Sequence, residues 1–190
     1  MPTAYRRYVR HRLTSAEQAE LIEVDAIAEG LVHHLDEESD AIDAAHVFGA
    51  GSMSIQTIVG ELLRHQVGFR EEVVLTPEDG FVTRARPDFF YDLGRGRGIL
   101  AEVERGGAVN NNHDLKDVWK AHIAPDAQHL FLIVPQQNTT QSGQGRERPF
   151  LRASGRISAF FGDIRREVDI LSAHVFGYGR LFGRDLTEGA

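Results

Sequence analysis

Three carboxylates in the middle of the chain have the residue types and spacing that could do chemistry. Asp88 follows a proline at the start of one apolar stretch, Glu102 and Glu104 lie in the next, and a Gly- and Arg-rich segment at 94–98 separates them. Residues two apart on a strand share a face, so Glu102 and Glu104 would both point towards a neighbouring strand that carries Asp88. Crowded carboxylates repel one another unless a cation or a proton intervenes. Oxygen ligands of this kind suit a hard divalent cation such as Mg²⁺.

Apolar periodicity around these acids predicts an α/β core that would position them. In chain order, the expected core elements are a helix at 54–66, short strands at 73–76, 81–85, 88–93 and 99–105, a helix at 112–123 and a strand at 129–134. We expect the short strands to form an antiparallel meander, and the uninterrupted apolar run at 129–134 is typical of a buried central strand. A further helix at 150–164 and a last strand at 168–176 are expected beyond this core.

Two expected helices have an apolar stripe at helical spacing. In the helix at 15–35, with Ser15 as a plausible N-cap, the stripe is Ala19, Ile22, Ala26, Ile27 and Leu31. In the helix at 112–123 the stripe is Leu115, Val118, Trp119 and Ile123. We expect both stripes to face the core.

Length and segment composition favour one domain spanning residues 1–190. Its expected parts are a basic arm at 1–12, an acidic helical extension at 13–43, a catalytic core at 54–136, a mobile polar loop at 137–149 and a C-terminal helix and strand extension at 150–190. The loop is predicted from its lack of apolar residues.

Charge and cysteine content limit the possible chemistry. The net charge is −7, but residues 13–43 hold ten acids and no Lys or Arg, so the rest of the chain is net positive. Nearly all the basic residues are arginines, which suit phosphates and guanine edges, although a genomic arginine bias gives the same pattern. The absence of cysteine excludes disulfides, thiol catalysis and cysteine-bound zinc. No apolar run approaches the roughly 18 residues of a membrane span, so we expect a cytoplasmic protein with no membrane partner.

The Pro87-Asp88 pair, the Glu102-Val103-Glu104 triplet on an apolar strand and the helix that follows resemble the PD-(D/E)XK nuclease superfamily. The third motif position, usually lysine, is Glu104 here, which is similar to the BamHI and BglII branch of type II restriction endonucleases, where E-X-K becomes E-X-E or E-X-Q. The resemblance covers roughly residues 54–136. It implies a restriction-endonuclease-like αβββαβ core, a mixed sheet flanked by helices, with the acidic N-terminal helix as an addition.

The resemblance also implies roles for individual residues. Asp88 and Glu102 would bind Mg²⁺, with Mn²⁺ as a substitute, and the carbonyl of Val103 would be a further ligand. Glu104 would serve as a general base or as a ligand of a second metal ion. Glu61, the only carboxylate of the first core helix, is the candidate for a fourth catalytic acid, although an ordinary exposed glutamate fits that position as well.

Asp92 is a reserve candidate, because it lies four residues after Asp88 on the same expected strand. Each of the acids also has a plain structural alternative. Asp88 could cap a turn, and Glu102 and Glu104 could lie on the wet face of an edge strand.

Polar and basic residues near the motif are candidates for contacts to nucleic acid. These are Arg105, Asn111, Asn112, Lys116 and Lys120. Lys116 and Lys120 are four apart on the expected helix, and either could replace the positive charge that Glu104 lacks if it reached the site. The alternative is that both lysines are merely solvated and that the asparagines cap the helix.

The expected function is a Mg²⁺-dependent endodeoxyribonuclease that cleaves double-stranded DNA as a homodimer, because one active site cuts one strand. The main alternative is a nuclease-like module that no longer cuts and serves DNA or protein binding. A third possibility is a phosphate-ester hydrolase acting on small nucleotides.

Overall fold

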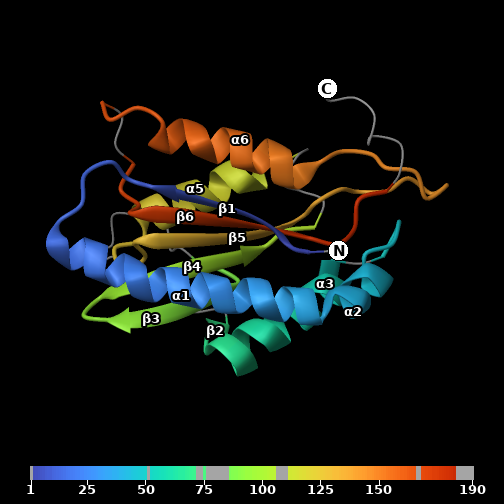
Figure 1. Cartoon of the computed structure of the whole chain (residues 1–190), viewed down its shortest axis with the longest axis horizontal. Helices are drawn as coiled ribbons and strands as arrows, with labels where there is room; N and C mark the ends of the chain where they lie inside the picture. The colour runs from blue at the N-terminus through green and yellow to red at the C-terminus, as the bar shows by residue number, and fades with distance from the viewer. Residues whose placement is uncertain are drawn as a thin grey trace.

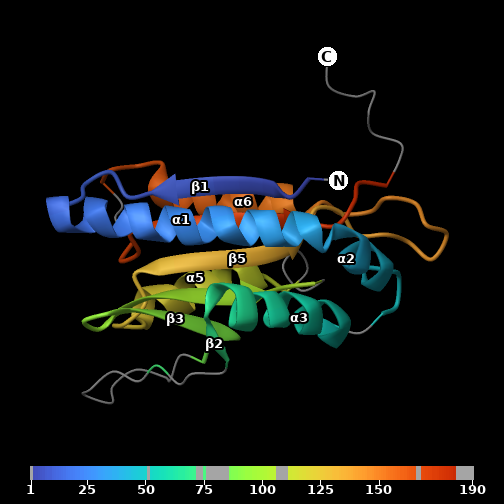
Figure 2. The ribbon, with the colours of Figure 1, turned by 60° about the horizontal axis from the view of Figure 1, so that its bottom comes forward.

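A mixed β-sheet with helices on both faces organises the chain (Figures 1 and 2). The computed structural model describes residues 2–50, 52–71, 75, 86–105, 111–165 and 168–182. Within them the sheet has six strands, in the spatial order β1 (Ala4–Val9), β6 (Ser172–Tyr178), β5 (His129–Pro135), β4 (Arg97–Val103), β3 (Phe89–Gly94) and β2 (Arg70–Glu71). Strands β4, β5 and β6 are parallel, whereas β1, β3 and β2 run antiparallel to their neighbours.

The helices form a layer on each side of the sheet (Figure 2). One layer contains α1 (Ser15–Glu37), α2 (Ser39–Ala45), α3 (Ser52–Glu61) and the π-helical turn η1 (Leu62–Val67). The other contains α5 (His113–Ile123) and α6 (Pro149–Phe161). The alternating side chains of β5 serve both layers, because Phe131 and Ile133 face the first and Leu130 and Leu132 face the second.

The predicted α/β class is confirmed. The elements from α3 to β5 follow the predicted order of helix, strands, helix and strand. The helix predicted at 54–66 begins two residues earlier and ends in η1, where Gly68 with φ of 93° closes it. The last strand, β6, extends two residues beyond the predicted one. The strand predicted at 81–85, and all of that at 73–76 except Leu75, lie outside the described residues.

Helix α1, which we expected as an addition to the catalytic core, packs its apolar face into the hydrophobic core of the protein. Its buried residues are Leu21, Val24, Ala28, Leu31 and Leu35. The predicted stripe was therefore rotated, and Ile22 is 73% exposed. Spacing alone could not choose between two neighbouring apolar stripes on one helix. The cap is also shifted by one residue: Thr14 and Glu17 form a capping box.

A chain of buried hydrogen bonds fixes α1 to the sheet. Because a carboxylate can only accept, Glu20 requires a proton on His129 Nε2 (2.7 Å), which leaves His129 Nδ1 to accept from the Ser172 hydroxyl (2.8 Å). Ser172 Oγ then accepts from His174 Nε2 (2.9 Å), and His174 Nδ1 accepts from the Tyr5 hydroxyl (2.7 Å). The donors therefore all point towards Glu20, and the chain joins α1 to strands β5, β6 and β1.

The structure also places three further features described from the sequence. The basic arm expected at 1–12 is largely strand β1, paired with β6. The polar loop expected to be mobile folds back on itself, with backbone hydrogen bonds from Asn138 to Glu147 and from Arg146 to Asn138. Trp119, expected in the core, is 51% exposed, because the buried positions of α5 are Asp114, Asp117, Val118 and Ala121.

Among the described residues, no helix has the length and apolar character needed to cross a bilayer.

Candidate active site

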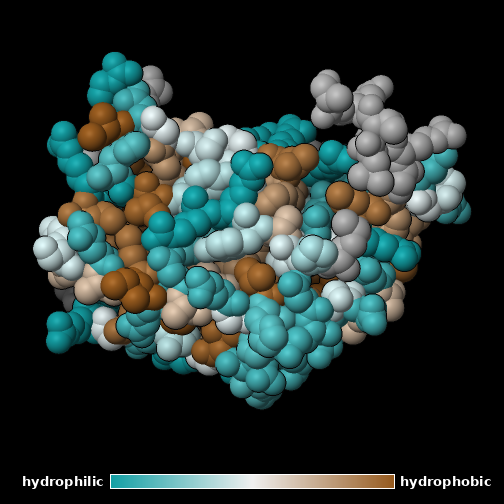
Figure 3. Space-filling model, in the orientation of Figure 1, coloured by the Kyte–Doolittle hydropathy of each residue, from teal (hydrophilic) through white to brown (hydrophobic). Residues whose placement is uncertain are grey.

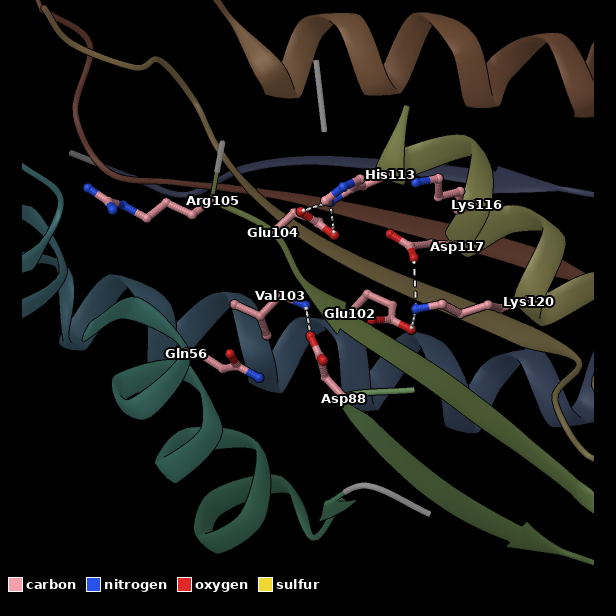
Figure 4. A pocket seen from close by; sticks show the side chains of 10 residues that line it. All are labelled: Gln56, Asp88, Glu102, Val103, Glu104, Arg105, His113, Lys116, Asp117 and Lys120. Atoms are coloured by element: carbon pink, nitrogen blue, oxygen red, sulfur yellow. Dashed lines mark hydrogen bonds and ion pairs between the residues drawn. The ribbon is translucent and has the colours of Figure 1, made fainter. Parts of the chain in front are cut away.

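A pocket of about 410 Å³ opens where β4 ends and α5 begins (Figure 4). We call it the carboxylate pocket. Its lining residues are Gln56, Asp88, Glu102, Val103, Glu104, Arg105, His113, Lys116, Asp117 and Lys120. The pocket therefore contains all three carboxylates that the sequence singled out.

Strand β4 positions two of these acids. Glu102 pairs with Leu132 in the central part of the sheet and is only 2% exposed. Glu104 lies one residue beyond β4, where its backbone N–H still donates to the Ile133 carbonyl at 2.8 Å. The buried hydroxyl of Tyr178, at the end of β6, donates to the Glu104 carbonyl at 3.1 Å. The backbone of Glu104 is thus held by hydrogen bonds to residues of β5 and β6.

Asp88, the residue directly before β3, reaches into the pocket. Strands β3 and β4 pair Phe89 with Ala101, which places Asp88 near Glu102 across the same ladder. The Asp88 carboxylate accepts a hydrogen bond from the Val103 backbone N–H at 3.0 Å. This bond completes the ladder and holds the carboxylate beside Glu102 (Figure 4).

Lys120 of α5 lies between two buried acids. Its ammonium is 2.6 Å from Glu102 Oε1 and 3.2 Å from Asp117 Oδ1. Asp117 is 2% exposed, and its Oδ2 is buried without a hydrogen-bond partner in the part of the chain that the structure describes. The possibility that Lys120 is merely solvated is therefore wrong. Sequence reasoning missed Asp117, which interrupts the apolar stripe of α5 and looks like an ordinary polar residue of an amphipathic helix.

Burial and mutual repulsion raise the pKa values of the two most buried acids in this pocket. Burial raises the pKa of Glu102, and the nearby carboxylates of Asp117 and Asp88 add to this, against the effect of Lys120. Burial likewise raises the pKa of Asp117. Burial lowers the pKa of Lys120, but Asp117 and Glu102 outweigh this and keep it above its usual value. We interpret the three raised pKa values as those of one charged lysine that is shared by two acids, one of which tends to retain a proton.

Glu104 has a partner of its own. His113, the first residue of α5, has its Nδ1 3.0 and 2.9 Å from the two carboxylate oxygens of Glu104. The proton must therefore lie on Nδ1, because a carboxylate accepts only. Burial raises the pKa of Glu104, and the His113 hydrogen bond partly offsets that rise. The raised pKa brings Glu104 closer to the neutral range, where a general base works best.

Two sequence candidates lie outside the pocket. Glu61 is exposed and paired with Arg64 (2.6 Å) and His65 (3.1 Å). It lies five residues beyond Gln56, the α3 side chain that does line the pocket, and so faces another direction. Asp92 is exposed near the other end of β3, where it accepts from the Gly94 N–H at 2.7 Å and pairs with Arg70.

The candidate nucleic-acid residues surround the pocket in different ways. Lys116 is exposed and lines it, whereas Arg105 extends away from the carboxylates (Figure 4) and donates to the Val47 carbonyl at 2.6 Å. Asn111 and Asn112 are exposed just before α5. Asn112 is the N-cap residue of α5, as the capping alternative expected, with φ of 54°, but its side chain makes no capping hydrogen bond to the described part of the helix.

The donor set fits a divalent cation in chemistry, although the side chains do not surround one point. Among the described residues, no group of three or more His, Cys, Asp or Glu side chains is arranged to hold an ion. The pocket nevertheless gathers Asp88, Glu102, Glu104 and Asp117, and it leaves Asp117 Oδ2 unpaired. Carboxylate oxygens are what Mg²⁺ and Mn²⁺ bind.

No protein-family model matches the chain, and no curated protein matches it. The assignment of a function therefore depends on the geometry of the pocket.

Proposed function

We propose that the chain is a Mg²⁺-dependent endodeoxyribonuclease that hydrolyses phosphodiester bonds of double-stranded DNA, with a restriction-endonuclease-like core of the PD-(D/E)XK type. The observation that carries the proposal is the Lys120 ammonium lying 2.6 Å from buried Glu102 in a pocket that also holds Asp88 and Glu104. A lysine and several acids around one opening are the groups that phosphodiester hydrolysis requires.

The order of elements supports the same proposal. Helix α3 with η1, strands β2, β3 and β4, helix α5 and strand β5 follow the αβββαβ order expected of that superfamily. Asp88 precedes one strand of the antiparallel pair, and the Glu102-Val103-Glu104 triplet ends the other. This arrangement of the motif residues supports the proposal.

Lys120 would replace the lysine that is missing from the triplet. Charge develops on the phosphate oxygens as the phosphodiester is attacked, and a fixed ammonium in a partly buried pocket stabilises that charge. Lys120 comes from α5, not from β4, but its ammonium is fixed beside Glu102. The acids around it hold its pKa above the usual value, so it stays charged throughout the working pH range.

Glu104 is the candidate general base. Its carboxylate is oriented by His113 and partly buried, and its raised pKa favours proton transfer from an attacking water. Asp88 and Glu102, with the carbonyl of Val103, would hold the metal ion. A divalent cation bound there would supply positive charge to the phosphate and lower the pKa of a water.

Cleavage of both DNA strands further implies a homodimer. One pocket acts on one strand, so two copies related by a twofold axis would be needed to cut a duplex. The proposed partners are double-stranded DNA as the substrate and a second copy of the chain.

The alternative is a nuclease-like module that binds DNA or protein without cutting. One observation favours it: Glu102 already pairs with Lys120, and a cation would have to compete with that ammonium. The two proposals differ in whether DNA bound at the pocket is hydrolysed.

Supercoiled plasmid incubated with Mg²⁺ or Mn²⁺ separates these proposals. We expect the wild type to nick or linearise the plasmid, and Asp88→Asn and Glu102→Gln to lose at least about 100-fold of the rate. The matched controls are Asp92→Asn and Glu61→Gln, acids of neighbouring elements that lie outside the pocket, and both should cut normally. Cleavage that survives Glu102→Gln would overturn the proposal, and DNA binding by the wild type without cleavage would favour the module.

A further inference from the structure

A second pocket, of about 430 Å³, lies beside the carboxylate pocket, and we call it the rim pocket. Its walls come from the connection between α2 and α3, the loop after β5 and the segment after β6. They include His46, Val47, Phe48, Thr140, Gln141, Arg180 and Phe182. Strands β4, β5 and β6 are parallel neighbours, so their carboxyl ends meet at one edge of the sheet. The two pockets therefore open at adjoining positions along that edge.

Arg105 links the two pockets directly. It lines the carboxylate pocket, and its Nη2 donates to the carbonyl of Val47, which lines the rim pocket, at 2.6 Å. A polymer bound with one unit in the carboxylate pocket would therefore carry its neighbouring unit towards the rim pocket.

The rim pocket exposes apolar and aromatic surface that the fold does not need. Val47 is 52% exposed and Phe48 is 53% exposed. Phe182 presents a ring with the Arg180 guanidinium 5.1 Å from its centre. Hydrophobic surface is visible beside the grey C-terminal atoms in Figure 3, where the segment that follows β6 lies. Aromatic rings next to a guanidinium form a stacking surface for a flat, polar ring system.

Polar groups complete the rim pocket. The Gln141 amide lies on its wall and can both donate and accept. The Thr140 hydroxyl on the same wall already bonds within its own loop, with Ser142 Oγ at 2.9 Å and with the Gln144 N–H at 3.2 Å. His46 Nε2 donates to the Gln137 carbonyl at 2.9 Å, and burial lowers the pKa of His46, so the ring is neutral and its Nδ1 is an acceptor. That Nδ1 is buried and has no hydrogen-bond partner among the described residues. Rings and bidirectional polar groups together match the faces and edges of a nucleobase.

We propose that the rim pocket binds one unstacked nucleobase of the strand whose phosphate occupies the carboxylate pocket. The inference rests on the proposed function, and it narrows the substrate to DNA with an unpaired or displaced nucleotide beside the cleaved phosphate. A base within a duplex is stacked on both sides and cannot lie against Phe48, so it has to leave the helix first. Stacking tolerates every base, so this pocket confers a preference for structure more than for sequence.

The test compares two labelled single strands of equal length, one with bases and one made of abasic deoxyribose phosphates. Both carry the same phosphate charge, so their difference in affinity measures the contribution of the bases. With Ca²⁺ replacing Mg²⁺ to limit cleavage, fluorescence anisotropy should show the wild type binding the base-bearing strand roughly tenfold more tightly. Phe48→Ala and Phe182→Ala should remove most of that preference. Ile22→Ala, a matched change of an exposed apolar residue on α1, should leave it intact.

Parallel plasmid cleavage distinguishes failure of the inference from failure of the proposed function. A wild type that cuts plasmid but binds both strands equally overturns the rim pocket alone, as does Phe48→Ala that keeps the full preference. A wild type that prefers bases through Phe48 but never cuts supports the rim pocket and overturns the cleavage proposal. Absence of both activities overturns both. Circular dichroism of each variant confirms that the fold is retained, which is expected because Phe48 is half exposed.

Discussion

At the scale of single residues, the pocket is held together by the contacts of one ammonium. Lys120 satisfies Glu102 and one oxygen of Asp117, both of which are almost fully buried. Removing one member of a buried ion pair leaves a charge with no partner, which costs more than the pair itself contributes. Lys120 therefore has a structural role in addition to its proposed chemical one.

Lys120→Met should separate these two roles. We expect loss of plasmid cleavage and a fall in the free energy of unfolding of about 1–3 kcal/mol near pH 8. The raised folded-state pKa values of Glu102 and Asp117 mean that both acids take up protons readily as the pH falls, so the loss of stability should shrink towards pH 5. Urea denaturation at both pH values measures this, with Lys116→Met as the matched control. Equal destabilisation at pH 5 and pH 8 would contradict the shared-proton interpretation.

His113 is a positioning residue for Glu104. His113→Ala should lower the cleavage rate about tenfold or more by releasing the carboxylate, and should change the acidic limb of the pH–rate profile. His113→Gln offers a neutral N–H donor in place of Nδ1 and should restore much of the rate. Plasmid cleavage from pH 5 to pH 9 is the measurement. Identical pH profiles for the wild type and His113→Ala would argue against Glu104 as the base.

Sequence spacing predicted the meeting of Asp88, Glu102 and Glu104, because strand alternation and a short turn restrict where such residues can lie. It did not predict the exclusion of Glu61, because the direction of a residue on a helix depends on how the helix rotates against the sheet. The sequence also did not single out Asp117 and His113 as site residues, because their directions depend on how α5 is rotated against the sheet. Each is an ordinary polar residue until α5 packs against β4.

At the scale of elements, the hydrogen-bond chain from Tyr5 to Glu20 ties three strands to α1. The order Ser172, His129, Glu20 is that of a nucleophile, a base and an acid. Ser172 and His129 are both 0% exposed, however, so no substrate can reach them as the protein stands. Arg97 also donates to Glu20 at 2.8 Å, and these bonds outweigh burial to hold the pKa of Glu20 below its usual value. The chain is therefore a structural network with a fixed direction.

The pH dependence of stability should report this network. Burial lowers the pKa of His174 to about 3 and also lowers that of His129, so both rings are neutral when folded but take up protons near pH 6.5 when unfolded. The contribution of these two neutral rings to the free energy of unfolding is complete above about pH 6.5 and is lost as the pH falls below it. Between pH 6.5 and pH 5 we expect the free energy of unfolding of the wild type to fall by about 1–2 kcal/mol more than that of His174→Gln. Urea unfolding across this range tests the difference, and parallel curves for the two proteins would contradict it.

Strand β1 was missed because its sequence does not alternate. Tyr5 and Tyr8 are half-buried, while Arg6 and Arg7 between them are exposed. An edge strand of this kind needs only one neighbour, and its pairing with β6 depends on residues more than 160 positions away. Local sequence could identify the central strand β5, which is buried along its whole length, but it could not identify this edge.

At the scale of the whole molecule, the parallel strands gather the carboxylate pocket and the rim pocket at one edge. Ligands of α/β proteins generally bind outside the carboxyl ends of such strands. The site is therefore assembled from residues between Gln56 and Lys120, and it is completed by Tyr178 at the end of β6. Binding of a cation in the carboxylate pocket should consequently stabilise the entire fold.

Mg²⁺ should raise the melting temperature of the wild type. At about 100 times its dissociation constant a ligand adds about 2.7 kcal/mol, which corresponds to roughly 5–10 °C for a chain of this size. Glu102→Gln and Asp88→Asn should show little or no rise, whereas Asp92→Asn should respond like the wild type. Differential scanning fluorimetry across a Mg²⁺ titration measures the shift. A rise of equal size in Glu102→Gln would place the cation elsewhere.

The β1 border of the sheet resists the addition of a foreign strand, and β2 is the outermost described strand on the other side. On one side the outermost strand carries exposed Arg6 and Arg7, and an incoming chain would have to strip water from Arg6 and disturb the ion pair of Arg7 with Asp25 (2.7 Å). On the other side β2 is only two residues long and offers almost no hydrogen-bonding template. Two copies of the protein would therefore not pair readily by adding a strand at β1.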